Sequence, residues 1–293
     1  MIHDLAKSIG GDRVISLPLI QGDLDPHSYQ LVKGDDEKLL GADLIFYNGL
    51  GLEHGASLAH ILKSSSKATA VGDTIFQKFP EKILWTEGTV DPHIWMDVSL
   101  WMHAIDPILD VLIEKEPESA GYFRENAADL KKRMALVHEE IFTKLQEIPA
   151  EKRYLVTSHD AFNYFAKGYL ASSEESLQGW EERFKAPEGL APEGQLNPLD
   201  LQRIITHLQK HQIRVIFPES NVSPASIEKI VRAGLEKGLC IKISNAPLYG
   251  DAMKSTSDRG ENYLETMRHN ADIITSQLGE YTDDLGSTSY STL

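Results

Sequence analysis

The sequence predicts an α/β protein with two βα halves on either side of one long helix. Short apolar segments alternate with amphipathic segments along most of the 293 residues, a pattern typical of parallel sheets with helical crossovers. The alternation is interrupted at residues 118–146, where apolar residues recur every three or four positions. A chain of this length is also long enough for about two domains.

The first half of the chain contains strand–helix repeats. Apolar residues at helical spacing predict a helix from Ile2 to Ile9, which a Gly-Gly pair ends. Residues 13–20 read as a short strand, and residues 44–47 read as a second strand that a glycine-rich turn and a helix follow. Residues 67–73 predict a third, weaker strand.

The interruption at residues 118–146 predicts a single amphipathic helix, roughly 40 Å long at about 1.5 Å per residue. Such a helix is either a rigid strut between two lobes or an ordinary long helix within one domain. Its predicted buried positions are Phe123, Ala127, Leu130, Met134, Val137, Ile141 and Leu145.

The βα pattern resumes in the second half. Residues 153–169 read as a strand, a turn and a helix, whereas residues 200–220 and 223–245 each read as a helix followed by a strand. Residues 172–198 are polar and rich in Glu, Gly and Pro, which favours a long loop or a small insertion. The polar residues after 279 predict a disordered tail.

The composition excludes some classes of protein. A formal net charge of -15 argues against binding to nucleic acid, which requires a cationic face; it is compatible with cationic ligands or simply with solubility. No apolar run is long enough to span a membrane, and no secretion signal is visible. The single cysteine, Cys240, lies in an apolar run, so we expect it to be buried in a strand rather than reactive.

Two histidines follow an Asp-Pro pair, as Asp25-Pro26-His27 and Asp91-Pro92-His93. Proline fixes its own φ near −65° and biases the preceding Asp towards extended geometry. Each histidine is therefore placed at the edge of a loop that has little backbone freedom.

Two further candidates follow strands in the second half. His159 comes directly after an apolar strand, at the end where open α/β sheets bind ligands, so chemistry is favoured over packing. Asp251 also follows an apolar segment and a glycine turn; taken alone, it reads as a turn former or a helix cap.

The other histidines read as ordinary surface or helix positions, except that His54 lies near a loop that could face the site. They are His3, His60, His103, His138, His207, His211 and His269.

Three imidazoles and one carboxylate suit Zn²⁺, Mn²⁺ or Fe²⁺, whereas Ca²⁺ and Mg²⁺ prefer oxygen. The four candidates come from separated loops, two before the long helix and two after it. They can meet only where two lobes meet, an arrangement that suits capture and release.

The chain resembles the manganese-, zinc- and iron-binding solute-binding proteins of bacterial ABC importers, from its first residues to about Leu278. The segments that carry the resemblance, in the family's order, are GDLDPHSYQ, GADLIFYNGLGLE, DPHIWMD, LVTSHDAFNYFAKGY, IFPESNVSP and YLETMRHN.

The resemblance implies two α/β lobes, each with a parallel sheet flanked by helices, joined by one rigid helix, with the metal in the cleft between the lobes. We expect residues 1–117 to form the N-terminal lobe, 118–148 the linking helix, 149–279 the C-terminal lobe and 280–293 a disordered tail. The implied ligands of a transported Zn, Mn or Fe ion are His27, His93, His159 and Asp251.

The resemblance also implies a partner, an ABC permease, and a periplasmic or cell-surface location. We expect a monomer that binds no nucleic acid. Three departures from the family stand out. Met1 opens directly on a helix, so either the start is truncated or the first sheet is one strand short. Residues 172–187 form a longer acidic stretch, and the histidine-rich loop of many zinc importers is absent.

Three acids near the candidate ligands could support them. Asp97 and Asp160 could each accept a proton from a ligand imidazole, or they could cap helices, and Glu219 could line the cleft. Two other functions compete with transport. One is a metal hydrolase, which would keep an open coordination position for water; the other is an adhesin or receptor-binding protein with a structural metal.

Overall fold

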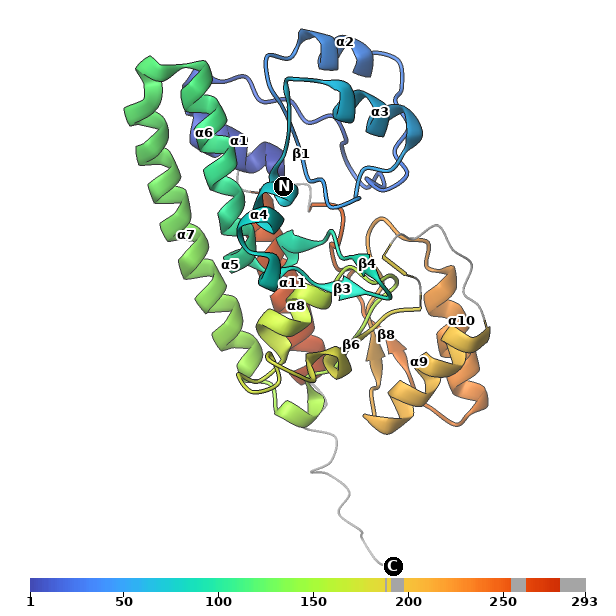
Figure 1. Ribbon diagram of the computed structural model, residues 1–293. Coiled ribbons are helices and arrows are strands. Elements are labelled where there is room, and N and C mark those ends of the chain that lie inside the picture. Colours follow the sequence, from blue (N-terminus) through green and yellow to red (C-terminus); the bar gives the residue numbers. More distant parts are fainter. Residues whose placement is uncertain (188, 191–197, 254–261, 280–293) are drawn as a thin grey trace, which may run out of the picture.

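The computed structural model describes residues 1–187, 189–190, 198–253 and 262–279, and shows helices and short strands along both halves of the chain (Figure 1). The helices are α1 (Ile2–Gly10), α2 (Asp35–Gly41), α3 (Ala56–Ser64), α4 (Val71–Lys78), α5 (Val98–Trp101), α6 (Ile105–Lys115), α7 (Ala120–Gln146), α8 (Asn163–Phe165), α9 (Pro198–Lys210), α10 (Ala225–Glu236) and α11 (Asn262–Gly279). The strands are β1 (Ile45–Tyr47), β2 (Ala68–Ala70), β3 (Trp85–Thr86), β4 (Thr89–Val90), β5 (Leu155–Val156), β6 (Phe184–Lys185), β7 (Val215–Ile216) and β8 (Lys242–Ile243).

The N-terminal half contains the predicted helix and two of its predicted strands. Helix α1 ends at Gly10, and the next residue, Gly11, has a φ of 52°, in the left-handed region that glycine tolerates. Strands β1 and β2 are parallel and pair Ile45 with Ala68, with α3 as the crossover between them. The weak strand predicted at residues 67–73 is therefore confirmed at Ala68–Ala70, whereas its last three residues begin helix α4.

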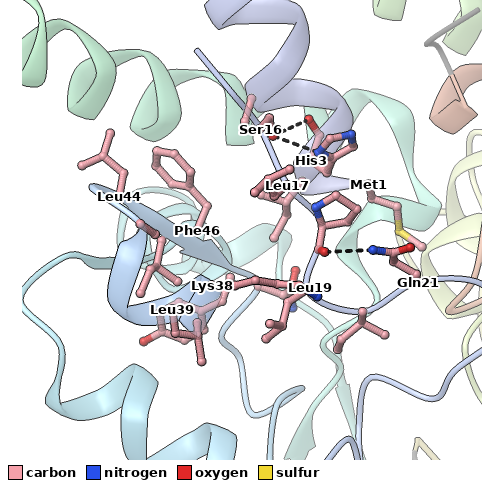
Figure 2. A pocket seen from close by; sticks show the side chains of 18 of the residues that line it. Met1, His3, Ser16, Leu17, Leu19, Gln21, Lys38, Leu39, Leu44 and Phe46 are labelled. Atoms are coloured by element: carbon pink, nitrogen blue, oxygen red, sulfur yellow. Dashed lines mark hydrogen bonds between the residues drawn. The ribbon is translucent and has the colours of Figure 1, made fainter. Parts of the chain in front are cut away.

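The strand predicted at residues 13–20 is wrong. Val14 has extended backbone angles, but the segment forms no ladder with a described strand. A cavity of about 1140 Å³ lies beside it, and Figure 2 shows Leu17 and Leu19 of the segment and Leu44 and Phe46 from the β1 side in its lining. An apolar sequence can predict an extended backbone, but a strand also needs a hydrogen-bonding neighbour.

In the C-terminal half, parallel pairs form between β5 and β6 and between β7 and β8. The backbone N–H of Phe217 donates to the carbonyl of Val156 at 2.9 Å, which places the β7 segment beside β5. Strand β6 lies within residues 172–198, which we expected to be loop or insertion, so that prediction is partly wrong. Cys240 precedes β8 and is exposed, so the prediction of a buried cysteine is wrong as well.

Helix α7 confirms the predicted long helix, and all seven predicted apolar positions are buried. Helices α1, α6 and α11 pack against it, and Figure 1 shows it running the height of the molecule. The five-residue π-helix that follows α8, Ala166–Leu170, also contacts α7.

One hydrophobic core crosses both halves of the chain. It runs from Leu5 and Ile9 of α1, past α7, to Met267 and Ile274 of α11. Smaller clusters lie under α2 and α3 and under α9 and α10. The two halves are therefore joined by shared packing as well as by a helix.

The tail at residues 280–293 lies outside the described residues, and the boundaries at residues 117, 148 and 279 stay a prediction. Among the described helices, none combines the length and the apolar character needed to cross a membrane.

We expect Met134→Ala to lower the free energy of unfolding by about 2–5 kcal/mol, because Met134 is fully buried where α7 meets the shared core. Urea denaturation of the metal-free protein measures the change. Leu136→Ala is the matched control: Leu136 lies on the same helix but is 70% exposed, so its change should stay within about 0.5 kcal/mol. Equal effects of the two substitutions would contradict the proposed burial.

Candidate metal centre

The two Asp-Pro-His segments form the same local turn. Oδ1 of Asp25 accepts the backbone N–H of His27 at 2.8 Å, and Oδ1 of Asp91 accepts the backbone N–H of His93 at 2.9 Å. This is the Asx-turn geometry in which an Asp side chain binds its own backbone two residues on. Each Asp therefore fixes the direction in which the following imidazole leaves the loop.

The other two candidates come from loops that follow strands β5 and β8. Oε1 of Glu219 accepts the backbone N–H groups of Ser158 and His159 at 3.0 and 2.9 Å. Gly250 precedes Asp251, and a Cβ at this position would lie 2.5 Å from Oε2 of Glu219 and 3.3 Å from Cε1 of His159. A glycine at this position therefore lets the Asp251 loop approach the Glu219 carboxylate this closely.

The four predicted side chains come together in a buried cluster. Nε2 of His27 lies 3.2 Å from Nε2 of His93 and 3.5 Å from Oδ2 of Asp251. The Asp251 carboxylate lies 3.3 Å from Nε2 of His93 and 3.0 Å from Nε2 of His159. Two atoms bound at about 2.1 Å in a tetrahedral shell are about 3.4 Å apart, so these separations match such a shell.

Two atoms that face the centre of the cluster, Nε2 of His159 and Oδ1 of Asp251, are buried without a hydrogen bond of acceptable geometry in the described part of the chain, as is Nδ1 on the other side of the His159 ring. Buried polar atoms are almost always satisfied. A cation at the centre of the cluster would satisfy both atoms at once.

Two carboxylates support the imidazoles from behind. Oδ1 of Asp91 lies 2.7 Å from Nδ1 of His93, and Oε2 of Glu219 lies 2.7 Å from Nδ1 of His159. Such carboxylates orient a ligand imidazole and direct its Nε2 lone pair towards a metal. This role of Asp91 is not among those predicted from the sequence, although its position in the repeated Asp-Pro-His segment indicated it.

Of the three acids that were predicted to support the site, one lies where it was expected and two do not contact the ligand imidazoles. Glu219 does line the site. Asp97 instead caps α5 and accepts the backbone N–H groups of Ser99 and Leu100, which is its helix-capping alternative. Asp160 accepts from Nδ2 of Asn163 at 3.1 Å, and Asn163 also donates to Asp91. Asp97 and Asp160 are therefore wrong as direct partners of the ligand imidazoles.

The family model described as "Zinc-uptake complex component A periplasmic" matches residues 1–277. The chain belongs to this family. It is 39% identical to the metal-binding protein YtgA of Chlamydia pneumoniae over 280 residues, which is 95% of this chain and 84% of that protein.

Two further relatives of the zinc-uptake component A family extend the comparison. The manganese-binding lipoprotein MntA of Bacillus subtilis is 33% identical over 94% of this chain and 87% of its own. The crystal structure of Fe(III)-bound YtgA from Chlamydia trachomatis superposes with a TM-score of 0.88 at 37% identity, and covers 95% of each chain. The predicted two-lobed α/β fold with its long helix is confirmed.

Burial and nearby negative charge have opposite effects on the pKa values of the three clustered imidazoles. Burial lowers the pKa of His27. Burial also acts to lower the pKa of His93, but the carboxylates of Asp91 and Asp251 outweigh it and raise that pKa to about 9. For His159, Glu219 and Asp251 outweigh burial in the same way and hold the pKa well above its ordinary value.

The Asp251 carboxylate completes this charge pattern. Burial alone would raise its pKa, but the three imidazoles, His159 foremost, hold the pKa well below the ordinary value. Without metal, the site at neutral pH therefore contains a charged Asp251 carboxylate, protonated His93 and His159, and a neutral His27.

The remaining histidines lie outside this cluster, with one unexpected result. The ring of His54 lies 5.7 Å from that of His27 but is exposed, and His60 is exposed on α3. His207, predicted to be on the surface, is buried with only 6% of its area exposed, so that prediction is wrong. Its polar neighbours in the sequence lie on the other faces of α9.

We expect the metal-free protein to lose stability as pH rises from about 6.5 to about 9, because His93 keeps its proton over this range only in the folded state. Asp91→Asn should lower the pKa of His93 and reduce this loss. Thermal melts at several pH values and NMR titration of the His93 ring measure both effects.

Asp25→Asn is the matched control, since Asp25 contacts the backbone N–H of His27 and the hydroxyl of Ser28 rather than an imidazole. Its pH profile should follow the wild type. A His93 pKa that is the same in wild type and in Asp91→Asn would contradict the electrostatic role given to Asp91.

Proposed function

We propose that this protein captures one divalent transition metal ion between its two lobes, with His27, His93, His159 and Asp251 as ligands, and delivers it to the membrane permease of an ABC importer. The observation that carries the proposal is the convergence of four ligand atoms from four separate loops, at the separations of a tetrahedral shell. Membership of the zinc-uptake component A family supports it.

The chemistry of the donors favours reversible binding. Three neutral imidazole nitrogens and one carboxylate suit Zn²⁺, Mn²⁺ and Fe²⁺. When the ion binds, His93 and His159 give up their protons, so two positive charges leave as two arrive. The buried acids therefore stay neutralised in both states, and neither loading nor release leaves a large uncompensated charge.

The arrangement supports transport over the competing functions. A metal hydrolase keeps a coordination position for water and a general base beside it, whereas here four protein atoms surround the centre and the partner acids are turned to the Nδ1 atoms. We therefore propose that the protein is not an enzyme. A purely structural metal in an adhesin would not require a site that exchanges metal for protons.

The setting follows from the family. We propose a periplasmic or cell-surface location, a monomeric state and no affinity for nucleic acid, the last supported by the net charge of -15. We also retain residues 1–117 and 149–279 as the two lobes and residues 118–148 as the helix between them.

The choice of metal is open to direct test, because the relatives name different metals. MntA is called manganese-binding, and the YtgA crystal structure is described as Fe(III)-bound. Nitrogen sites bind Zn²⁺ more tightly than Mn²⁺ or Fe²⁺, so we expect Zn²⁺ to win a competition in solution whatever the cell supplies.

We expect His93→Ala to weaken Zn²⁺ and Mn²⁺ binding at the interlobe site by at least about 100-fold, because loss of even an outer-sphere partner costs about 10–100-fold. Competition with a chromophoric chelator measures the affinity. His60→Ala, an exposed histidine on α3, is the control and should bind like the wild type. Wild-type affinity of His93→Ala for every metal tested would overturn the ligand set.

We expect metal binding at pH 7 to release about two protons, from His93 and His159. The logarithm of the affinity should rise by about two per pH unit near neutrality, and the slope should fall as the pH passes about 9, where His93 loses its proton without metal. Calorimetry in buffers of different ionisation enthalpy counts the protons. A count near zero at pH 7 would show that the imidazoles are already neutral and would contradict the exchange of metal for protons.

A further inference from the structure

A second cluster of metal-ligating side chains lies away from the interlobe site. One potential ligand atom from each of Glu182, His207 and His211 lies within 4.8 Å of the other two. The two histidines belong to α9 and its C-terminal end, and Glu182 belongs to the 3₁₀ turn Trp180–Arg183. Figure 1 shows α9 on the side of the molecule opposite α7.

The helix places the two imidazoles on one face. The backbone N–H of His211 donates to the carbonyl of His207 at 3.1 Å, so the helical geometry continues to His211. Residues four apart on a helix lie one turn apart on the same side, and the two ring centroids are 4.6 Å apart. A pair of histidines with this spacing is a common metal-binding arrangement on helices.

The burial of His207 is the observation that points to a ligand. Its side chain is 94% buried, and its Nε2 atom has no hydrogen-bond partner among the described residues. A buried polar atom without a partner is costly. Burial lowers the pKa of His207 to about 4, so its ring is neutral at pH 7, and the geometry does not depend on its titration.

Glu182 supplies the third donor and the negative charge. Its Oε2 atom lies 3.1 Å from Nε2 of His211 and 2.6 Å from Nζ of Lys210. Tyr154 stacks on the ring of His211, with 4.0 Å between centroids, which holds that imidazole in place. The Glu182 side chain is half exposed, so a metal ion can enter from solvent.

The positive charges near the cluster lower the affinity that we expect it to have for a divalent cation. Lys210 occupies the same carboxylate oxygen, and Lys185 lies close enough to affect the pKa of His207. A divalent cation has to displace Lys210, whose side chain is 60% exposed and free to move into water. The site should therefore be weaker than the interlobe site, where only acids and imidazoles face the centre.

We propose that Glu182, His207 and His211 form a second, weaker binding site for a borderline transition metal ion such as Zn²⁺. Two nitrogens and one oxygen leave room for water in the shell. Because affinity for such sites rises from Mn²⁺ towards Zn²⁺, Mn²⁺ should fill only the interlobe site. The second site, formed by Glu182, His207 and His211, does not depend on the proposed transport function.

Titration of the full chain with Zn²⁺ and, separately, with Mn²⁺ tests the proposal. We expect two Zn²⁺ per wild-type chain in two affinity classes, and one Mn²⁺. Glu182→Gln and His211→Gln should each weaken the second Zn²⁺ class by at least about tenfold, whereas Glu181→Gln, a neighbouring exposed acid, should leave it unchanged. Thermal melts without metal verify that each variant is folded.

Lys210→Gln separates a metal site from a purely structural ion pair. If Lys210 competes with the metal, its removal should tighten the second class by roughly threefold; if Glu182 serves only as an anchor for Lys210, removal gives no such gain. A single Zn²⁺ class that survives Glu182→Gln, a second class that survives both Glu182→Gln and His211→Gln, or no tightening in Lys210→Gln would each overturn the proposal.

The transport proposal and the second-site proposal can be disproved independently of each other. His93→Ala should remove the tight class and leave the weak one. If His93→Ala changed nothing and Glu182→Gln removed all Zn²⁺ binding, the transport site would be wrong and the second site would stand.

Discussion

The contacts between buried imidazoles and buried carboxylates are the constraint on which the rest of this structure depends. Asp91, Glu219 and Asp251 are all nearly inaccessible to water, and isolated charges in such a place would be strongly unfavourable. Protons on His93 and His159 can neutralise them, and so can a metal ion. The site is therefore stable with either occupant, which is the property that a carrier of metal requires.

The scaffold holds these side chains by backbone rather than by flexible side-chain packing. Asx turns fix His27 and His93, and a Glu219 oxygen shared by two backbone N–H groups fixes His159. The indole of Trp95, from the N-terminal half, donates to the carbonyl of Gly250 at 2.8 Å. This bond ties the Asp251 loop to the opposite lobe, so the four loops form one connected unit across the cleft.

The elements that the sequence predicted are those with a repeated local pattern. The long helix follows from seven apolar residues at helical spacing, and β1 and β2 follow from short apolar segments bounded by turns. The segment at residues 13–20 has the same local pattern but lacks a paired neighbour, and no local signal reveals that. Strand β6 has a paired neighbour but lacks the apolar local pattern, because its two residues lie in a polar, acidic stretch. It was therefore not predicted.

In the candidate site, too, the features with a local sequence pattern were predicted and those that depend on distant contacts were not. The two Asp-Pro-His segments and the resemblance to metal-binding solute-binding proteins led to the four candidate ligands. Which acid supports which imidazole depends on contacts between distant residues, such as Glu219 and His159, 60 positions apart, and spacing cannot show them. The burial of His207 depends likewise on Tyr154, which lies more than 50 residues earlier and whose ring is 6.1 Å from the His207 ring.

The core shared along α7 has a consequence for how such proteins can diversify. Leu5 and Ile9 at one end of the chain and Met267 and Ile274 at the other belong to a single packed cluster, and close-packed interiors tolerate little change in shape. A hybrid that joins the N-terminal half of one relative to the C-terminal half of another would combine core side chains that are not complementary in shape. New specificities should therefore arise more readily by altering loops in place than by recombining halves.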